Sequence, residues 1–222
     1  MPASGGGQPT AVNRARDPAL VIVDMQNDAP LEVPAARDTI AAHRKLIGAF
    51  RAAGRPVIYT KFVSHPHETL LWNWSPQCRP PVKCCWKGHT RTYGDCEGPR
   101  DCTEVIDELH PAEGDVVIEK HGYGAFHETD LADRLRALGV SSLFITGTVT
   151  QICVEETARE AFHHGFPATL VADAVSSFDA ELHVATLRNF AMKFGWVEDS
   201  DAALARLAVL SNSAAQDTPV NT

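Results

Sequence analysis

The 222-residue sequence contains no run of about 20 apolar residues, the length that a helix needs to cross a bilayer. Its first 17 residues lack the apolar stretch of a secretory signal peptide. An excess of basic residues is also missing, and the net charge of −8 argues for solubility and against a nucleic-acid-binding surface. These absences predict a cytoplasmic protein that has neither a membrane nor a nucleic acid as its partner.

The cysteines lack the C-x-x-C spacing that is typical of zinc sites. Five of the six nevertheless fall within one stretch of the sequence, at Cys78, Cys84, Cys85, Cys96 and Cys102. Adjacent cysteines are poorly spaced zinc ligands, and a cytoplasmic chain is not expected to carry structural disulfides. We therefore expect packed or exposed thiols here, with a redox-sensitive bond and a metal site as the alternatives.

Apolar segments typical of strands alternate with segments of helical periodicity. This order predicts an α/β fold, a doubly wound, mostly parallel sheet of six strands flanked by helices. The hydrophobic fraction of 44% and the length suit one domain, which we place at residues 18–210. A flexible N-terminal segment, 1–17, and a flexible tail, 211–222, are expected on either side. Residues 62–114 interrupt the alternation as a long insertion, which is typical of a functional segment.

The boundaries follow from where each apolar pattern begins and ends. The expected strands lie at 19–23, 56–61, 115–119, 142–146, 168–171 and 195–198. The expected helices lie at 35–53, 129–138, around Cys153, 181–192 and 199–207. Gly54 and Gly139 close two of these helices, as glycines often do at a helix C-terminus.

Cys153 follows a buried strand and a Gly-Thr turn, and it falls in the first turn of the predicted helix. A helix N-terminus offers unpaired N–H groups and the positive end of the helix dipole. Both favour the thiolate, which is the nucleophilic form of cysteine, and the same N–H groups can receive an oxyanion. An isolated cysteine is more often a small buried hydrophobe, so the interpretation depends on two other segments.

Asp24 and Lys120 each stand at the end of an apolar run, and a glycine-rich turn follows Lys120. In open parallel sheets, functional groups gather at the carboxyl ends of the strands. Asp24 alone would equally suit a turn or a helix cap, and Lys120 alone a solvated position. Three parallel strands that lead to Asp24, Lys120 and Cys153 would bring the three groups together.

Four segments resemble the motifs of a known family: 23–28, 120 with 123–126, 129–131 and 147–154. Through them the chain resembles the isochorismatase-like cysteine hydrolases over residues 18–208. That superfamily includes nicotinamidase, N-carbamoylsarcosine amidase, ureidoacrylate amidohydrolase and biuret hydrolase. The resemblance implies that Asp24, Lys120 and Cys153 form a catalytic triad.

The resemblance also implies an activity. It is the hydrolysis of a C–N bond in a small amide, ureido or carbamoyl compound through a thioester, with release of ammonia or an amine and without a cofactor. The peptide bond between Thr148 and Val149 would be cis, and the Val149 and Cys153 amides would face the oxyanion. Relatives commonly form dimers or tetramers, so we expect a homodimer or a homotetramer.

Two other functions fit the same fold. An isochorismatase-type vinyl-ether hydrolase is one, but relatives with that activity do not use a cysteine nucleophile, so Cys153 counts against it. The other is a catalytically silent binding domain, which has no physical reason to retain all three triad residues.

His65 and His67 follow the second strand, where the nicotinamidases that this chain resembles carry metal ligands. Their pattern places an aspartate two positions before the first histidine, and this chain has Val63 there. We therefore predict no metal. A metal held by His65, His67 and His89 is the alternative, and surface or pocket histidines are the simpler interpretation.

The substrate pocket departs from the family pattern, because Ala29 and Pro30 replace the aromatic residue that usually follows the second aspartate of the first motif. This change enlarges the pocket unless another side chain fills the gap. The candidates for its walls are Trp72, Trp74, Tyr123, Phe126 and Gln151. Core packing is the alternative role for the aromatic side chains.

The insertion also supplies three cations that could hold a substrate carboxylate: Arg79, Lys83 and Arg91. Most such charges are simply solvated. The length of the insertion and the sequence of residues 194–197 resemble the ureido-cleaving branch of the family more than nicotinamidase, so we expect a ureido substrate.

Overall fold

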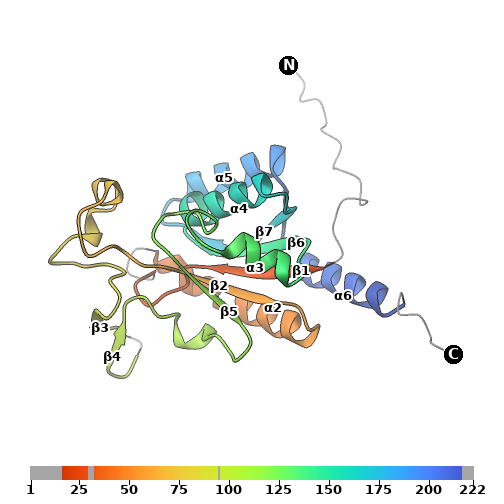
Figure 1. Cartoon of the computed structure of the whole chain (residues 1–222), viewed down its shortest axis with the longest axis horizontal. Coiled ribbons are helices and arrows are strands. Elements are labelled where there is room, and N and C mark those ends of the chain that lie inside the picture. The colour runs from red at the N-terminus through yellow and green to blue at the C-terminus, as the bar shows by residue number, and fades with distance from the viewer. Residues whose placement is uncertain (1–16, 30–32, 95, 217–222) are drawn as a thin grey trace, which may run out of the picture.

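A computed structural model of the chain describes residues 17–29, 33–94 and 96–216. Six strands form one sheet in the order β5-β2-β1-β6-β7-β8, and neighbouring strands are parallel throughout (Figure 1). Their bounds are Pro18–Val23 (β1), Val57–Phe62 (β2), Val116–Lys120 (β5), Ser142–Thr148 (β6), Ala168–Ser176 (β7) and Trp196–Glu198 (β8). The predicted fold class is confirmed, and each expected strand is present, with β7 longer than expected.

The central strand β1 shows why both faces of the sheet must be covered, since all of its residues are buried. Ala19, Val21 and Val23 belong to one core cluster, and Leu20 and Ile22 belong to another. Successive side chains of a strand point to opposite faces, so a strand that is apolar at every position needs a partner layer on each side.

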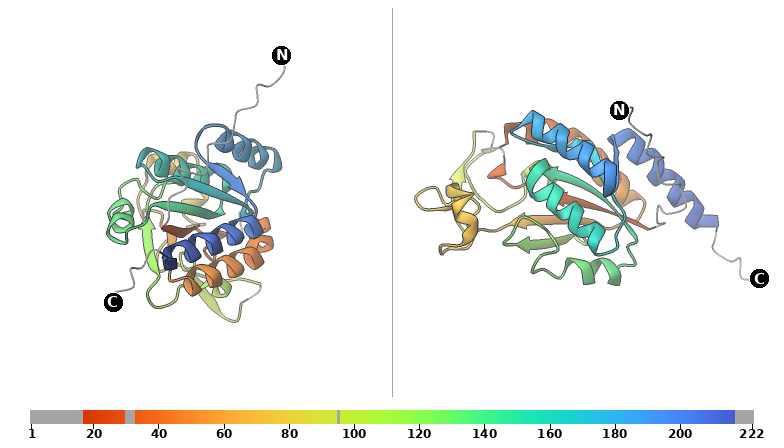
Figure 2. Two further views of the ribbon diagram at one scale, coloured as in Figure 1. Left: turned by 90° about the vertical axis from the view of Figure 1, so that its right-hand side faces the viewer. Right: turned by 90° about the horizontal axis from the view of Figure 1, so that it is seen from above.

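Helices provide those two layers (Figure 2). Leu46 of α2 and Leu207 of α6 lie in the core on one face, and Leu135 of α3, Ala158 of α4 and Phe190 of α5 lie in the core on the other. The bounds of these helices are Ile40–Ala52 (α2), Leu131–Ala137 (α3), Glu155–His163 (α4), Ala180–Lys193 (α5) and Ser200–Gln216 (α6).

The first helical segment differs from its prediction. Where one helix is expected over residues 35–53, a 3₁₀ helix, η2 (Pro34–Thr39), precedes α2. The Thr39 hydroxyl donates a hydrogen bond of 2.7 Å to the Ala36 carbonyl three residues earlier, and this bond favours the tighter turn.

The two ends of the domain also differ from expectation. Helix α6 continues to Gln216, so residues 211–216, predicted as part of a flexible tail, are helical. At the other end the Asp17 amide donates to the Ser141 hydroxyl at 2.9 Å, which anchors the last residue of the predicted flexible segment. The rest of these predictions, on residues 1–16 and 217–222, lies outside the described residues.

The predicted insertion lies between β2 and β5 and holds only short elements. They are η3 (Leu70–Asn73), η4 (Pro76–Cys78), β3 (Thr90–Thr92), β4 (Pro99–Asp101) and η5 (Asp107–Leu109). Gln26 ties this segment to the sheet, because its side-chain amide donates to the carbonyls of Phe62 and Thr103, each at 2.9 Å. The Phe62 amide in turn donates to Gln26 Oε1. The insertion is therefore fastened beside the carboxyl end of β1.

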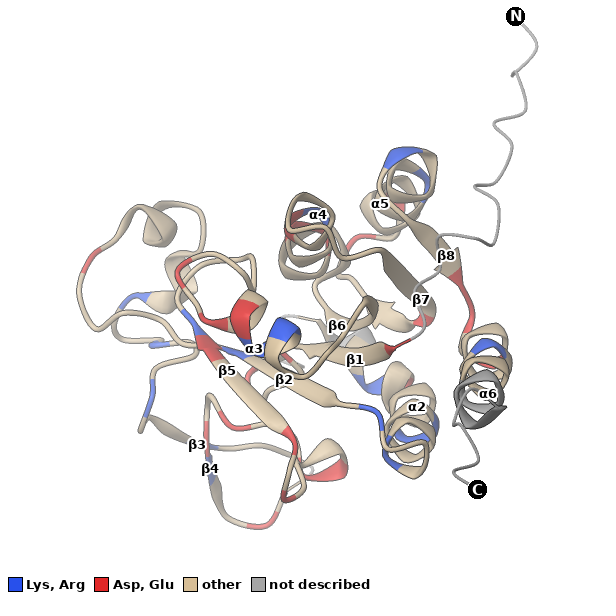
Figure 3. Ribbon diagram, turned by 45° about the vertical axis from the view of Figure 1, so that its right-hand side comes forward, with Lys and Arg blue, Asp and Glu red and all other residues tan. Residues whose placement is uncertain are grey.

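Basic and acidic residues are interspersed along the ribbon rather than gathered by sign (Figure 3). In the part of the chain that the structure describes, none of the helices has the length and apolar character to cross a membrane.

Candidate active site

Asp24 comes directly after β1 and is buried. Its φ of 51° lies in the left-handed region, which few residues other than glycine adopt and which aspartate tolerates better than most. The Thr60 hydroxyl donates to Asp24 Oδ1 at 2.6 Å, and Asp24 Oδ2 lies 2.7 Å from Lys120 Nζ. Both carboxylate oxygens are thus fixed by neighbouring strands.

Lys120 is the last residue of β5, and its side chain is fully buried. Its ammonium donates to the carbonyls of Gly122 and Tyr123, at 3.0 and 2.8 Å, in addition to its ion pair with Asp24. Burial opposes the charged form, but the Asp24 carboxylate and Cys153 outweigh it and raise the pKa of Lys120 above its ordinary value. Lys120 is therefore a permanent cation at this site.

Cys153 lies close enough to Asp24 and Lys120 for both to act on the pKa of its thiol. Burial raises the pKa of its thiol well above the ordinary value, and the nearby Lys120 cation lowers it only in part. This differs from the expectation that the helix N-terminus would favour the thiolate. These directions favour a neutral thiol at Cys153 and an ammonium at Lys120.

The backbone around Cys153 explains how it reaches this position. The peptide bond between Thr148 and Val149 is cis, as the resemblance implies. The predicted first helical turn is a π-helical turn, Thr150–Val154, in which the Val154 amide donates to the Val149 carbonyl at 3.2 Å. Single π turns of this kind are frequent at functional sites. Helix α4 follows directly.

Gly147 allows the strands that carry Asp24 and Cys153 to approach each other. It pairs with Val23 across β1 and β6, and its φ is 109°. A Cβ atom at this position would stand 2.0 Å from the Val23 carbonyl oxygen, so only glycine fits here.

Two residues of α4 that the sequence analysis did not single out hold the turn after Lys120. The Ala125 amide donates to the Thr157 hydroxyl at 3.1 Å, and the Phe126 amide donates to Glu160 Oε2 at 2.8 Å. Since this turn supplies the carbonyl acceptors of Lys120, α4 positions the cation as well as the cysteine. In the sequence, only the spacing of Thr157 and Glu160 after Cys153 could indicate this role. That spacing alone does not predict a contact with the turn after Lys120.

The aromatic candidates for pocket walls lie in different parts of the structure. Trp72 packs in a small core of the insertion with Cys78 and Cys84, and Phe126 packs in the main core, so both take the packing role. Trp74 is 80% exposed, on the surface of the insertion. Tyr123 is half-buried, and its hydroxyl lies 3.1 Å from the Ser75 hydroxyl.

Gln151, the remaining candidate, lies between the cis peptide bond and Cys153. Both polar atoms of its side-chain amide are buried without a hydrogen-bond partner. A buried amide in this condition costs free energy until a partner reaches it. Gln151 is therefore a strong candidate for substrate contact.

The predicted carboxylate-binding cations already have partners. Arg79 donates to Glu68 at 2.9 Å, and Arg91 donates to the buried Asp28 at 3.1 Å. Lys83 lies 5.3 Å above the ring of Trp86. These contacts occupy Arg79 and Lys83 within the insertion and tie Arg91 to Asp28 outside it.

His65, after β2, stacks on His121, after β5, and is tilted against His67. The ring centroids of His65 and His121 are 4.1 Å apart, and those of His65 and His67 are 4.9 Å apart. Burial and the two neighbouring rings lower the pKa of His65. Val63, at the position of the family's aspartate, is buried, and its carbonyl accepts from His121 Nδ1 at 2.7 Å.

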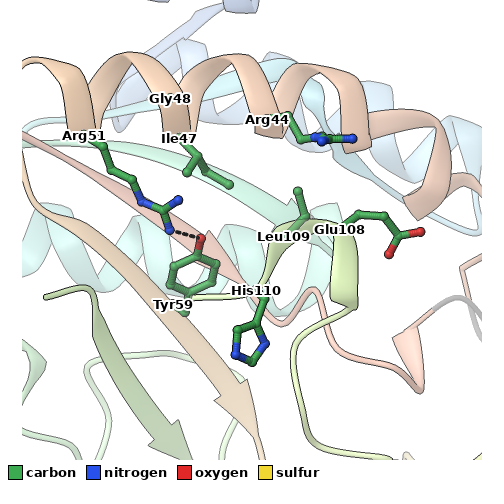
Figure 4. A pocket seen from close by; sticks show the side chains of 8 residues that line it. All are labelled: Arg44, Ile47, Gly48, Arg51, Tyr59, Glu108, Leu109 and His110. Atoms are coloured by element: carbon green, nitrogen blue, oxygen red, sulfur yellow. Dashed lines mark hydrogen bonds between the residues drawn. The ribbon is translucent and has the colours of Figure 1, made fainter. Parts of the chain in front are cut away.

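A hollow of about 240 Å³ lies elsewhere, between α2, β2 and η5 (Figure 4). Arg51 donates to the Tyr59 hydroxyl within it and pairs with Asp115 at its side. None of the proposed triad residues lines this hollow. This hollow is therefore separate from the proposed active site around Cys153.

Comparison with known proteins identifies the family. The model of the isochorismatase domain matches residues 18–202. The chain is 32% identical over 228 residues to ureidoacrylate amidohydrolase RutB of Methylobacterium radiotolerans, covering 90% of this chain and 84% of the relative. It is 32% identical over 201 residues to nicotinamidase 3 of Arabidopsis thaliana, covering 85% and 90%. The crystal structure of a cysteine hydrolase from Pseudomonas syringae is similar with a TM-score of 0.77 and 26% identity, covering 88% of this chain and 94% of that one. The chain therefore belongs to the isochorismatase family of hydrolases.

Proposed function

We propose that this hydrolase is a cysteine amidohydrolase, which cleaves the C–N bond of a small amide or ureido compound and releases ammonia or an amine. The observation that carries the proposal is the contact of 2.7 Å between Lys120 Nζ and Asp24 Oδ2, beside the Cys153 thiol. A nucleophile, a base and a buried cation in contact are the groups that acyl transfer to sulfur requires. The relatives named as amidohydrolases support the same reaction class.

Asp24 is the proposed general base. Because burial raises the pKa of Cys153, the thiol keeps its proton until a substrate carbonyl lies against it. Asp24 then accepts the proton as the sulfur bonds to the carbonyl carbon, and Lys120 offsets the negative charge that moves through the site. Asp24 returns the proton to the departing nitrogen, and a thioester remains.

Hydrolysis of the thioester uses the same groups. Asp24 takes a proton from a water molecule, the water oxygen bonds to the carbonyl carbon, and the C–S bond breaks with return of a proton to Cys153. In both halves the carbonyl oxygen becomes an oxyanion. We assign the backbone N–H groups of Val149 and Cys153 to it, because donors aimed at developing charge are usually the largest single contribution to catalysis.

The substrate class follows from Gln151. Its amide offers both a donor and an acceptor, and both atoms are buried without a partner. A ureido or carboxamide group presents the complementary acceptor and donor, so binding would satisfy both atoms at once. This match supports a ureido or primary amide substrate with an N–H group on the side that faces Gln151.

The proposed enzyme is a homodimer or homotetramer, and we assign α5 to the contact between copies. Leu182, Val184 and Met192 on this helix are 48%, 52% and 67% exposed. Exposed apolar side chains on one helix can contribute to an interaction surface. Light scattering on the purified chain tests this assignment, and a monomer at micromolar concentration would refute it. The cytoplasmic location expected from the sequence stays a prediction.

The decisive experiment measures ammonia release from a panel of nicotinamide, biuret, ureidoacrylate, N-carbamoyl amino acids and simple amides. Wild-type protein is compared with Cys153→Ala, which removes the sulfur and leaves the fold intact. Release by the wild type alone would support the proposal and identify the substrate branch. Silence of folded wild-type protein across the panel, or turnover of isochorismate-like vinyl ethers, would overturn it.

A further inference from the structure

A second group of reactive side chains lies outside the proposed triad. The adjacent cysteines Cys84 and Cys85, in the loop between η4 and β3, face Asp28, four positions after Asp24. One ligand atom from each of the three residues lies within 4.8 Å of the other two. Within the described ranges, no other set of three or more histidine, cysteine, aspartate or glutamate side chains comes this close.

The distance between the two sulfurs suits a shared metal ion. Cys84 Sγ and Cys85 Sγ are 3.7 Å apart. Zinc–sulfur bonds are about 2.3 Å long, so two sulfurs on one tetrahedral zinc ion stand about 3.8 Å apart. A disulfide would require about 2.05 Å. The observed separation is that of two thiols in contact, and a shared zinc ion would require almost the same separation.

The backbone holds this arrangement at a cost. Neighbouring side chains of an extended strand point to opposite sides, so adjacent cysteines do not ordinarily converge. Here Lys83 and Cys85 have φ values of 56° and 54°, in the left-handed region on either side of Cys84. Residues with a side chain rarely adopt this conformation. Tertiary contacts keep the two thiols on the same side.

Asp28 is held in place as metal-binding carboxylates usually are. Its Oδ2 accepts from the Cys85 amide at 2.9 Å, and its Oδ1 accepts from the Tyr93 hydroxyl at 2.6 Å and from Arg91 Nε at 3.1 Å. Such partners fix the orientation of a ligand and strengthen binding. Two thiolates and a carboxylate carry three negative charges, and a divalent cation together with Arg91 neutralises them.

We propose that Cys84, Cys85 and Asp28 bind a thiophilic divalent cation, with Zn²⁺ as the best match to two sulfurs and one carboxylate oxygen. Binding one ion releases the two thiol protons, so no oxidant or reductant is involved. A water molecule completes the tetrahedron. The role of the ion is structural, because it links the insertion to the segment that directly follows Asp24.

The spacing of the cysteines in the sequence indicates a metal site here only as an alternative. The third ligand comes from a residue more than fifty positions earlier, and only the fold brings it close. The insertion has a small core, whose buried members are Trp72, Cys78 and Cys84. A bound ion that links the insertion to the segment after β1 would therefore stabilise it.

The test uses full-length protein with Cys153→Ala, so that the proposed nucleophile cannot bind metal. The reduced protein is stripped with a chelator and titrated with Co²⁺, whose charge-transfer absorption reports sulfur ligands, and then with Zn²⁺ followed by elemental analysis. We expect one tightly bound ion per chain and cobalt–thiolate absorption. Cys84→Ser and Cys85→Ser should each abolish the absorption, and Asp28→Asn should weaken binding about 10- to 100-fold.

Cys96→Ser is the matched control, since it removes a half-buried thiol of the same insertion and should retain full binding. Circular dichroism of each variant separates loss of the site from loss of the fold. The proposal is overturned if folded, reduced protein binds no stoichiometric metal. It is also overturned if either serine variant at position 84 or 85 keeps the absorption, or if Cys96→Ser loses it equally. A peptide that is lighter by two hydrogens across Cys84 and Cys85, without metal binding, would identify a disulfide instead.

Discussion

The carboxylate of Glu160 occupies the space where a side chain on Gly124 would have to lie. A Cβ atom at position 124 would stand 2.2 Å from Glu160 Oε2, which already accepts a hydrogen bond from the Phe126 amide. The same turn supplies the Tyr123 carbonyl to Lys120 Nζ. The glycine and the glutamate together therefore connect α4 to the cation of the proposed triad.

Replacing Gly124 with alanine should lower kcat by about 10- to 100-fold, because a displacement of a catalytic group by about an ångström costs that much. Glu160 is a flexible side chain and can swing aside, so the fold should survive. The Phe126 amide then loses its acceptor, and the turn that holds Lys120 loosens. Steady-state kinetics on the substrate identified in the ammonia-release panel provide the measurement.

The control for that prediction is a pair of variants at the partner position. Glu160→Gln keeps an oxygen acceptor for the Phe126 amide and should retain most activity, whereas Glu160→Ala should resemble Gly124→Ala. Equal activity in all three variants and the wild type would show that this contact does not position Lys120.

Thr60→Val should lower kcat about 10- to 100-fold. The substitution is nearly isosteric and removes only the hydroxyl that donates to Asp24 Oδ1 at 2.6 Å. A hydrogen bond to a charged group contributes about 1.5–3 kcal/mol, which corresponds to that range of rates. Thr146→Val is the matched control, since that buried hydroxyl donates to the Val21 carbonyl and touches no triad residue. An equal loss in both variants would indicate a general packing effect.

The proximity of Asp24, Lys120 and Cys153 can be predicted from the sequence because each residue follows a local pattern. Asp24 follows the fully buried strand β1, Lys120 ends the edge strand β5, and parallel strands bring their carboxyl ends to one edge of the sheet. The six strands follow from the same alternation. In contrast, Thr60 reaches Asp24 across 36 residues, and nothing in its own neighbourhood distinguishes it from any threonine of a strand.

Three other features escaped prediction for physical reasons. The π-helical turn before α4 has about one more residue than a turn of α-helix. A single turn of this kind does not change the hydrophobic periodicity from which helices are predicted. The burial of Cys153 outweighs the local effect of the helix terminus on its pKa, and burial is a property of the whole fold. The roles of Trp72 and Trp74 were also undetermined, since aromatic residues in an insertion pack against partners that periodicity cannot identify.

Acid should destabilise the protein through His43. This residue of α2 is buried, with Nδ1 2.9 Å from the Thr39 carbonyl, and burial lowers its pKa to about 4. The unfolded chain therefore takes up this proton at a higher pH than the folded one. The contribution is present above about pH 6.5 and is lost as the pH falls toward 4, by roughly 3 kcal/mol at 1.36 kcal/mol per pKa unit.

Urea unfolding at pH 7, 5.5 and 4.5 measures this loss. His43→Leu should flatten the decline of unfolding free energy with acid, and His110→Leu, at an exposed position, should leave the decline unchanged. Parallel declines in the wild type and His43→Leu would assign the acid sensitivity to carboxylates instead.

Alkylation of Cys153 in the free enzyme should be slower than that of N-acetylcysteine at pH 7. The thiolate is the reactive form, and an ordinary cysteine with a pKa of about 8.5 is already a few per cent ionised at that pH. Since burial raises the pKa of Cys153, its thiolate fraction is smaller, and its rate should climb steadily between pH 7 and 9. Iodoacetamide labelling with peptide mapping separates Cys153 from the other cysteines. Labelling of Cys153 that is faster than the free thiol at pH 7 would mean that Lys120 stabilises a resting thiolate, and the proton transfer to Asp24 would then precede substrate binding.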